Sequence, residues 1–455
     1  MNETISMMAT TGLLGYGFGE EAFRHGMELP LDFIAADAGS MDPGPYYLGA
    51  GVPFVSRKAL KRDISIMLAG ALEKNIPMLI GSAGGGGSAP QVELVREIVE
   101  EISTEQGYHF KMAVIYADQD TSFLRQRMRD GKIEPLGPID DVTDATLDET
   151  HRVVAMMGVE PFQKALREGA QVVIAGRATD ASIYSAIPLM HDFDPGLVWH
   201  LSKIIECAGA VAVPKTGQDC MIGVLHRNHF EVVPAHPDSR CTRMSIAAHT
   251  LYENPSPYQL EEPEGTVITE NSVYEQIDHR TVKVSGSQFK RSNRYTVKLE
   301  GVRRAGYRMA FIAGSRDPGL IAIVDSFVES CRQRVARDTA SLGISSDDYQ
   351  LSVRVYGQSG TMASREPVQD AQPHEIGILA EVMADDEETS RAVMAKTRLA
   401  LLHSDFPGRK CISGNLAIPF SPSDLSVGET YEFNLWHVME IDDPLQPFPI
   451  EFKEL

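Results

Sequence analysis

The hydrophobic pattern is most regular between residues 76 and 120, where apolar, glycine-rich and amphipathic segments follow one another. Residues 76–81 form a short apolar run, which is typical of a strand buried on both faces of a parallel sheet. Between residues 92 and 102, valine and isoleucine recur at helical spacing with charged residues on the other side, which predicts an amphipathic helix. Residues 114–116 predict the next strand. Such a right-handed unit places its loop at the carboxyl edge of the sheet, where ligands bind.

Four consecutive glycines connect the first of these strands to the helix. Glycine lets the backbone adopt positive φ and bring its N–H groups close to an anion, and the dipole of the following helix favours negative charge. The predicted anion-binding residues are Gly84, Gly85, Gly86, Gly87 and Ser88, of which the serine suits the N-cap. No lysine follows the loop and its spacing differs from GxGxxG, so nucleotide hydrolysis is not expected. A turn that binds nothing is the structural alternative.

A second apolar run, residues 31–36, predicts a buried strand that ends in acidic and hydroxyl side chains. Asp37, Ser40 and Asp42 follow it closely, where α/β enzymes position their chemistry. Asp37 or Asp42 is a candidate general base, metal ligand or contact for substrate hydroxyls, and Ser40 is a candidate substrate contact. Turn formation is the alternative, because Asp42 begins an Asp-Pro-Gly sequence.

A third buried strand is predicted at residues 171–175, after a helix predicted at residues 149–168. Arg177 and Asp180 follow this strand. Arg177 is the best candidate for pairing a carboxylate or phosphate, because its planar guanidinium forms bidentate contacts with oxygen. Asp180 is a candidate acid or base, with helix capping as the structural alternative.

The next predicted helix, residues 196–213, carries a cluster of polar residues. His200, Lys203 and Cys207 share one face at spacings of three and seven, and Glu206 lies beside them. These groups can exchange protons or shift one another's pKa, and we take His200 as the catalytic candidate. A solvated lysine on a half-exposed helix is the alternative for Lys203.

A run of histidines follows, with His226, His229 and His236 between Cys220 and Cys241. Their spacing matches no zinc pattern, and the valine-rich pairs between them are typical of strands. The sequence therefore predicts no metal ligands and no cofactor, although a divalent metal stays open.

Composition and charge narrow the classes of protein. Apolar residues make up 43% and charged residues 23% of the chain, as in an ordinary globular enzyme. The net charge of −21 disfavours nucleic acid and anionic membranes as partners. The amino terminus does not resemble a signal peptide, and no apolar run is long enough to cross a membrane. The five cysteines are scattered without a CxxC pair, so a cytoplasmic location is expected.

At 455 residues the chain is longer than one hydrophobic core usually supports. Residues 254–270 are rich in proline and glutamate and predict an extended surface connection near a domain boundary. Alternation at residues 295–299 and 307–311 predicts antiparallel strands. We therefore predict an α/β fold with a doubly wound, mostly parallel sheet in an N-terminal domain (residues 1–240). A C-terminal α+β domain (residues 241–455) packs against it and completes an interdomain cleft for the substrate.

Several motifs carry a resemblance to a known family. The longest, at residues 240–258, reads Arg-Cys-Thr-Arg-Met-Ser-Ile-Ala-Ala-His-Thr-Leu-Tyr-Glu-Asn-Pro-Ser-Pro-Tyr. The others are Ile-Gly-Ser-Ala-Gly-Gly (80–85), Ala-Gly-Arg-Ala-Thr-Asp-Ala-Ser (175–182), Ile-Glu-Cys-Ala-Gly (205–209), Ala-Gly-Ser-Arg-Asp-Pro (313–318), Val-Tyr-Gly-Gln-Ser-Gly (355–360) and Gly-Asn-Leu-Ala-Ile-Pro-Phe-Ser-Pro-Ser-Asp (414–424). By these motifs the chain resembles the acyclic terpene utilisation family, formerly a domain of unknown function.

The resemblance implies a role in the bacterial breakdown of branched acyclic terpenes, whose intermediates are acyl-CoA thioesters. It also implies a small companion protein, separate or fused. The first hypothesis is a catabolic enzyme of the lyase or hydratase class that acts on a small branched carboxylate or its acyl-CoA thioester. In this scheme the glycine loop and Arg177 hold the anionic group, Asp37 moves a proton and His200 assists. We expect the enzyme to be a homo-oligomer.

Two alternatives belong to other classes. A metal-assisted hydrolase would draw its ligands from Asp37, Asp42, Asp118 or His200. A non-catalytic subunit would bind a ligand and work with the small partner protein.

Overall fold

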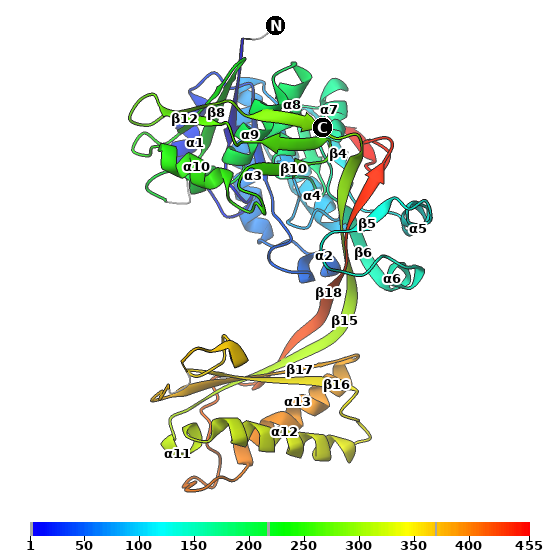
Figure 1. Cartoon of the computed structure of the whole chain (residues 1–455), viewed down its shortest axis with the longest axis vertical. Coiled ribbons are helices and arrows are strands. Elements are labelled where there is room, and N and C mark those ends of the chain that lie inside the picture. Colours follow the sequence, from blue (N-terminus) through cyan, green and yellow to red (C-terminus); the bar gives the residue numbers. More distant parts are fainter. Residues whose placement is uncertain (1–2, 216–218, 369–370) are drawn as a thin grey trace. The chain divides into compact units, whose positions relative to one another are not determined.

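The structure is a computed structural model that describes residues 3–215, 219–368 and 371–455. The chain divides into two compact units (Figure 1), one formed by Met1–Arg303 with Phe433–Leu455 and the other by Arg304–Glu432. The sequence predicts a boundary after residue 240, whereas residues 241–303 and 433–455 belong to the first unit of the structure. Residues 450–454 pair with residues 111–115 of the first unit, and residues 282–284 pair with residues 230–232. No local pattern in the sequence reveals these pairings.

The first unit is built on a ten-stranded sheet of the described residues. Its centre has five strands, all parallel to their neighbours, in the order β1 (Thr4–Ala9), β2 (Phe33–Asp37), β3 (Met78–Gly81), β7 (Val172–Ala175) and β4 (Lys111–Ile115). Antiparallel strands extend it on both sides, namely β8 (Met221–His226), β9 (Phe230–Pro234), β13 (Val282–Ser285) and β12 (Val273–Gln276) beyond β1, and β19 (Ile450–Glu454) beyond β4. The predicted α/β class is thus confirmed.

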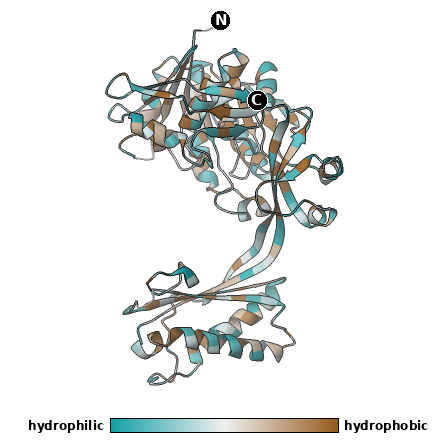
Figure 2. Cartoon of the chain, viewed as in Figure 1, coloured by the Kyte–Doolittle hydropathy of each residue, from teal (hydrophilic) through white to brown (hydrophobic). Residues whose placement is uncertain are grey.

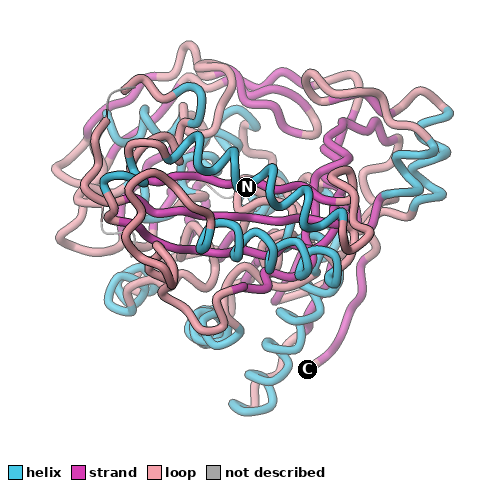
Figure 3. Tube along the Cα trace, turned by 90° about the horizontal axis from the view of Figure 1, so that it is seen from below, coloured by secondary structure: helices cyan, strands magenta, loops and turns pink. Residues whose placement is uncertain are grey.

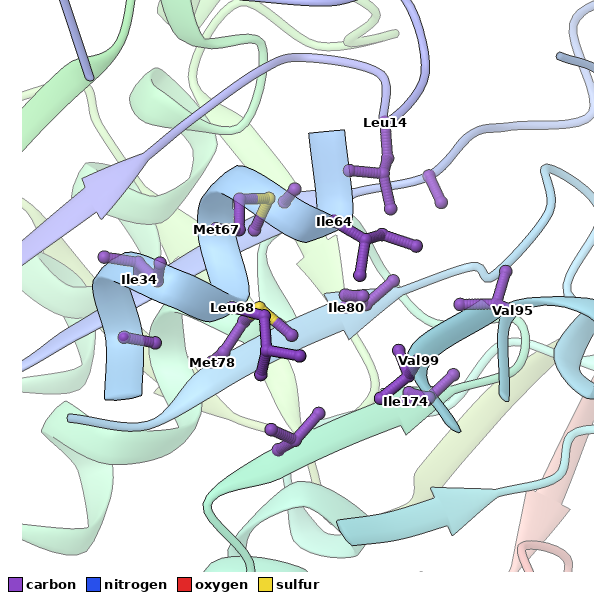
Figure 4. Close-up of a cluster of buried hydrophobic side chains, with 14 of the residues drawn as sticks. Leu14, Ile34, Ile64, Met67, Leu68, Met78, Ile80, Val95, Val99 and Ile174 are labelled. Atoms are coloured by element: carbon purple, nitrogen blue, oxygen red, sulfur yellow. The ribbon is translucent and has the colours of Figure 1, made fainter. Parts of the chain in front are cut away.

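Helices cover both faces of this sheet. One face packs against α3 (Arg57–Lys74) and α4 (Ala89–Gln106). Figure 4 shows the apolar side chains that meet there, among them Ile34, Met78, Ile80 and Ile174 of the strands, Met67 and Leu68 of α3, and Val95 and Val99 of α4. Burying each such side chain stabilises the fold by about 1.5–3 kcal/mol. The other face packs against α8 (Ser182–Met190), since a Cβ at Gly81 would lie 2.9 Å from Ile183 and the Tyr184 hydroxyl donates to the Ala35 carbonyl.

The remaining elements of the first unit lie around this core. The helices are α1 (Glu20–Met27), α2 (Tyr46–Ala50), α5 (Thr121–Arg129), α6 (Asp144–Glu149), α7 (Glu160–Arg167), α9 (Pro195–Ile205), α10 (Arg243–Thr250) and the 3₁₀ turn Ala208–Val211. A three-stranded antiparallel sheet consists of β10 (Gln259–Glu262), β11 (Gly265–Ile268) and β14 (Gln288–Arg291). The helix predicted at residues 149–168 is wrong in its first half, which is strand β6 (Thr150–Ala155), paired with residues 299–303 of β15 (Tyr295–Ser315). β-Branched Val153 and Val154 favour that extended conformation.

The second unit is a sheet covered by helices. Residues 307–315 of β15 pair with β17 (Ile376–Ala384), which also pairs with β16 (Tyr349–Tyr356). Two long helices, α12 (Val324–Ala340) and α13 (Glu387–His403), share one core with these strands, and Figure 3 shows helices lying across strands. Hydrophobic and hydrophilic residues alternate along the helices and strands of this unit (Figure 2). The antiparallel strands predicted at residues 295–299 and 307–311 are confirmed as parts of β15. The second unit also contains α11 (Pro318–Ile321) and the 3₁₀ turn Ala363–Arg365. β18 (Asp424–Ile441) belongs partly to each unit and pairs with β5 (Ile133–Pro135) of the first.

No helix among the described residues combines the length and apolar character needed to cross a membrane.

Candidate functional site

The polar ends of the parallel strands meet at one edge of the sheet. Asp37 is the last residue of β2, and Arg177 follows β7. A Cβ at Gly39 would lie 2.6 Å from the Cα of Gly85, and one at Gly87 would lie 2.2 Å from the backbone nitrogen of Arg177. The segments after β2, β3 and β7 are therefore in direct contact, as parallel pairing requires.

Asp37 is buried in this edge with an incomplete set of hydrogen bonds. Its Oδ2 accepts a hydrogen bond from the Gly39 N–H at 3.0 Å, and its Oδ1 has no partner in the described part of the chain. Burial, followed by the charge of Asp180, raises the pKa of Asp37 well above its usual value, although Arg177 opposes the shift. Both influences favour the protonated form of this carboxyl group.

Arg177 is equally buried and is held by the protein's own acidic groups. Its Nε donates to Glu300 at 2.7 Å, and its Nη1 lies 3.7 Å from Asp180. Glu300 also pairs with Lys298 at 2.8 Å, and these two cations lower its pKa although burial alone would raise it. Nη1 donates further to the Ser82 hydroxyl at 3.2 Å. The guanidinium therefore fixes the positions of two carboxylates, one on each side.

A second ion pair lies next to this arginine. The Lys203 ammonium of α9 donates to Glu206, the C-cap residue that follows this helix, and lies 3.9 Å from Glu253. The Tyr252 ring faces the ammonium at 5.6 Å. Burial lowers the pKa of Lys203, but the charge of Glu206 outweighs it and the pKa is raised, so the lysine stays protonated.

Glu206 differs from an ordinary surface carboxylate. Its side chain is 3% exposed, and burial raises its pKa to about 8 in spite of the attraction of Lys203. Burial likewise raises the pKa of Glu262 to about 8, and Thr179 bonds to this carboxyl group. Asp180 and Glu253 are more open, with side chains 29% and 42% exposed. Solvent therefore reaches the site beside Asp180 and Glu253.

We refer to these residues as the edge cluster, which consists of Asp37, Arg177, Asp180, Lys203, Glu206, Glu253 and Glu262. It contains five carboxyl groups and two cations, so Coulomb repulsion and burial together favour keeping some of the carboxyls protonated. Such a mixture of protonated acids, a carboxylate and a fixed ammonium can donate, accept and stabilise charge.

The glycine loop has a different environment from the one expected of an open anion site. Gly84, Gly85 and Gly87 have positive φ values of 74°, 109° and 67°, and residues 81–88 are all buried. The N-terminus of α4 is occupied by the protein's own Asp118, whose Oδ2 accepts from the Ala89 N–H at 2.6 Å. Close packing and this internal carboxylate account for the loop, including Gly86.

Ser88 belongs to the same N-terminus, where its hydroxyl donates to Gln91 Oε1 at 2.8 Å and completes a capping box. Ser40 and Asp42 form a turn near the edge cluster, because the Ser40 hydroxyl accepts from the Asp42 N–H at 3.2 Å. The Asp42 side chain is exposed.

His200 is not in the edge cluster. Its ring is fully buried, with Nδ1 2.6 Å from the Ser287 hydroxyl and Nε2 2.9 Å from the Thr250 hydroxyl. Burial lowers its pKa to about 3, so the imidazole is neutral. The predicted shared face with Cys207 does not exist, because α9 ends at Ile205.

Sequence reasoning misses two members of the edge cluster, Glu253 and Glu262, and also Glu300, the partner of Arg177. Glu253 and Glu262 lie in or beside the proline- and glutamate-rich stretch that predicts a surface connection, yet they meet Lys203 and Thr179. Glu300 belongs to a long strand and gives no local signal. Only its contact with Arg177, 123 positions away in the chain, reveals its role, and that contact is a property of the fold.

Comparison with known proteins finds a family match over a part of the chain that includes four residues of the edge cluster. The profile of the family described as acyclic terpene utilisation family protein AtuA matches residues 57–216. This range includes Arg177, Asp180, Lys203 and Glu206, and it confirms the family resemblance over that stretch. The motifs beyond residue 216 lie outside it. No curated protein and no solved structure matches the chain.

Proposed function

We propose, taking the resemblance of residues 57–216 to the acyclic terpene utilisation family as the premise, that the protein is a catabolic enzyme of the lyase or hydratase class. Its substrate would be a small branched carboxylate or the acyl-CoA thioester of one. The observation that carries this proposal is the buried edge cluster, in which acidic groups of different protonation surround a fixed ammonium.

Addition or removal of water next to a carbonyl group requires three chemical functions. A base takes the proton from the carbon beside the carbonyl, an acid protonates the departing hydroxyl, and a cation or N–H group stabilises the charge that develops on the carbonyl oxygen. Two carboxyl groups serve as acid and base only when their environments separate their pKa values.

In our proposal the partly exposed Asp180 is the base: burial raises its pKa, and the charges of Arg177 and Lys203 counter that shift in favour of the ionised form. Glu206, with its pKa near 8, is the acid, and Asp37 is a second protonated group behind it. Lys203 stabilises the developing negative charge, because it remains protonated and borders the exposed side of the cluster.

This assignment departs from the scheme based on the sequence in two residues. Arg177 donates to Glu300 and Ser82 and lies 3.7 Å from Asp180, so we assign it the role of positioning the carboxylates instead of holding the substrate. His200 bonds to Ser287 and Thr250, so the acid and base come from the carboxyl groups.

The test is a turnover screen of the purified full-length protein against a panel of branched acyl-CoA thioesters and hydroxy acids. We expect Asp180→Asn and Glu206→Gln to lower kcat by about 10²–10⁴-fold, the usual contribution of acid–base groups. Asp118→Asn is the matched control, because Asp118 lies at the same sheet edge but bonds to Ala89 and Arg152. Equal loss in all three variants, or no loss in the first two, would refute the assignment.

A second candidate is a metal-assisted hydrolase. It is favoured by the oxygens of Asp180, Glu206 and Glu253, which lie within 4.8 Å of one another, a spacing that a divalent cation could bridge. The Lys203 ammonium already contacts two of these three carboxylates, however, and a metal would have to displace it. This candidate would be favoured over the first by two results. The purified protein would contain stoichiometric metal that is lost in Glu206→Gln, and chelators would abolish its activity. Turnover that appears only after a small companion protein is added would instead favour a subunit role.

A further inference from the structure

The hairpin that joins β8 to β9 brings two histidines and a glutamate together. His226 ends β8, His229 lies in the turn, and Glu231 follows in β9. The two imidazole rings stack with centroids 4.3 Å apart and an interplanar angle of 7°. Both Nε2 atoms face the same carboxylate oxygen, since Glu231 Oε1 lies 3.8 Å from His226 Nε2 and 3.5 Å from His229 Nε2.

Hydrogen bonding fixes which nitrogen of His229 is free. Its Nδ1 lies 2.7 Å from the Asn228 amide oxygen, which only accepts hydrogen bonds, so Nδ1 carries the proton. In this tautomer the lone pair is on Nε2, which lies 3.5 Å from Glu231 Oε1. This is the arrangement of metal-binding histidines, whose second nitrogen donates to a protein oxygen.

His226 presents a second nitrogen with no competing contact. Its Nε2 is buried and has no hydrogen-bond partner in the described part of the chain. The side chain of His226 is 29% exposed, so an ion from solvent can reach this ring. Two ring nitrogens and a carboxylate oxygen thus lie within 4.8 Å of one another, close enough for one cation to contact all three.

The basic side chains near the hairpin bond to other groups. Arg227 donates to the carbonyls of His191 and Asp192 and lies 4.0 Å from the Phe193 ring centroid. Lys283, which pairs with Glu231 across the sheet, places its ammonium 3.0 Å from Glu275. Neither of these cations fills the space between the three side chains.

We propose that His226, His229 and Glu231 bind a divalent transition metal of the zinc type, with a water in the remaining position. A tetrahedral zinc with bonds of about 2.0–2.1 Å to nitrogen and oxygen holds its ligand atoms about 3.4 Å apart. The two measured distances exceed this value by a few tenths of an ångström, and all three ligand atoms lie within 4.8 Å of one another. Binding requires one of the two partly exposed rings to rotate out of the stack, so that both nitrogens face the same ion.

This site is separate from the edge cluster. β8 runs antiparallel to β1, with His226 opposite Thr4 and Met221 opposite Ala9, so the hairpin lies at the amino end of the parallel strands. The edge cluster lies at their carboxyl end. The metal would therefore tie two antiparallel strands together near the start of β1, and the inference does not depend on the proposed reaction.

The experiment is isothermal titration of the full-length, tag-free, metal-stripped protein with Zn²⁺, and of His226→Ala, His229→Ala and Asn228→Ala. We expect one equivalent to bind and both histidine variants to lose it. Asn228→Ala keeps all three ligands but frees the His229 ring, so its affinity should fall by about 10–100-fold. Co²⁺ in place of Zn²⁺ should give the visible absorption of a tetrahedral site, and His229→Ala should abolish it.

His236→Ala is the matched control, because His236 belongs to the same stretch of sequence but contacts Glu21 instead. Glu206→Gln controls for binding at the edge cluster. Both controls should retain the equivalent that His229→Ala loses. Absence of Zn²⁺ binding in the wild type, binding that survives His229→Ala, or an Asn228→Ala variant with unchanged affinity and cobalt spectrum would overturn the proposal.

Discussion

Replacing Glu206 by glutamine should make the protein more stable relative to the wild type as the pH rises. Burial raises the pKa of Glu206 to about 8, well above the value of about 4.5 expected when the chain is unfolded. A carboxyl group whose pKa is raised by folding stabilises the folded state fully below the unfolded pKa. That stabilisation is lost as the pH rises through the folded pKa.

The magnitude follows from the difference in bound protons. Between pH 5 and pH 8 the unfolded chain has released the Glu206 proton while the folded protein still holds it, so unfolding becomes easier by about 1.4 kcal/mol for each pH unit. Over the whole interval the loss amounts to about 3–4 kcal/mol. Glutamine is uncharged and lacks this dependence, so the free energy of unfolding of Glu206→Gln should fall less steeply by that amount.

The assay is urea denaturation of both proteins at pH 5, 6, 7 and 8, with the difference in unfolding free energy plotted against pH. Glu300→Gln is the control, because Arg177 and Lys298 lower the pKa of Glu300 in spite of its burial. The contribution of Glu300 is therefore present above its unfolded pKa and constant over this range. Glu300→Gln should lower the free energy of unfolding by about 3–5 kcal/mol at every pH, because Arg177 is left buried without the charge of Glu300. A flat difference for Glu206→Gln would show that Lys203 and Glu206 form an ordinary ion pair and would refute the reasoning.

Three further results are expected. Gly87→Ala should destabilise the protein by at least about 3 kcal/mol, since the new Cβ would lie 2.2 Å from the backbone nitrogen of Arg177. The control Gly107→Ala has the same φ of 67° but open space around it, so it should cost only about 1–2 kcal/mol. Similar thermal shifts for the two variants would contradict the packing role of the glycine loop. Asp118→Ala should cost about 1–2 kcal/mol in chemical denaturation, because it removes the acceptor of the Ala89 N–H, and unchanged stability would rule out the capping role. Asp37→Asn should change stability by less than about 1 kcal/mol, because the raised pKa favours the neutral carboxyl group, which asparagine resembles, yet it should lower turnover. A large loss of stability at pH 7 would mean that Asp37 is ionised.

Several features of the site follow from local sequence. The apolar runs of β2, β3 and β7 predict buried parallel strands, and this geometry alone brings Asp37 and Arg177 to one edge. The amphipathic α4 is predicted by its own periodicity. These predictions succeed because burial on both faces, or on one, leaves a periodic trace in the residues of a single element.

Other features depend on contacts between distant segments. Glu253 and Glu262 look like surface residues in or beside a proline-rich stretch. In the structure Glu262 meets Thr179 from β10, and Glu253 meets Lys203 from the turn after α10. Glu300 reaches Arg177 across 123 positions of the chain. The spacing of His226 and His229 matches no zinc pattern, and only the register of the hairpin turns both rings toward Glu231.

The sequence by itself determined the α/β class, the buried strands and the edge at which their polar residues gather, because hydrophobic periodicity records how much of each element is covered. The tertiary structure decided which polar groups meet there, which of them hold protons and that Asp118 instead of an external anion occupies the N-terminus of α4. Partners and protonation are set by pairings between strands and by the depth of burial. Both are properties of the assembled chain, and neither leaves a trace in any short stretch of residues.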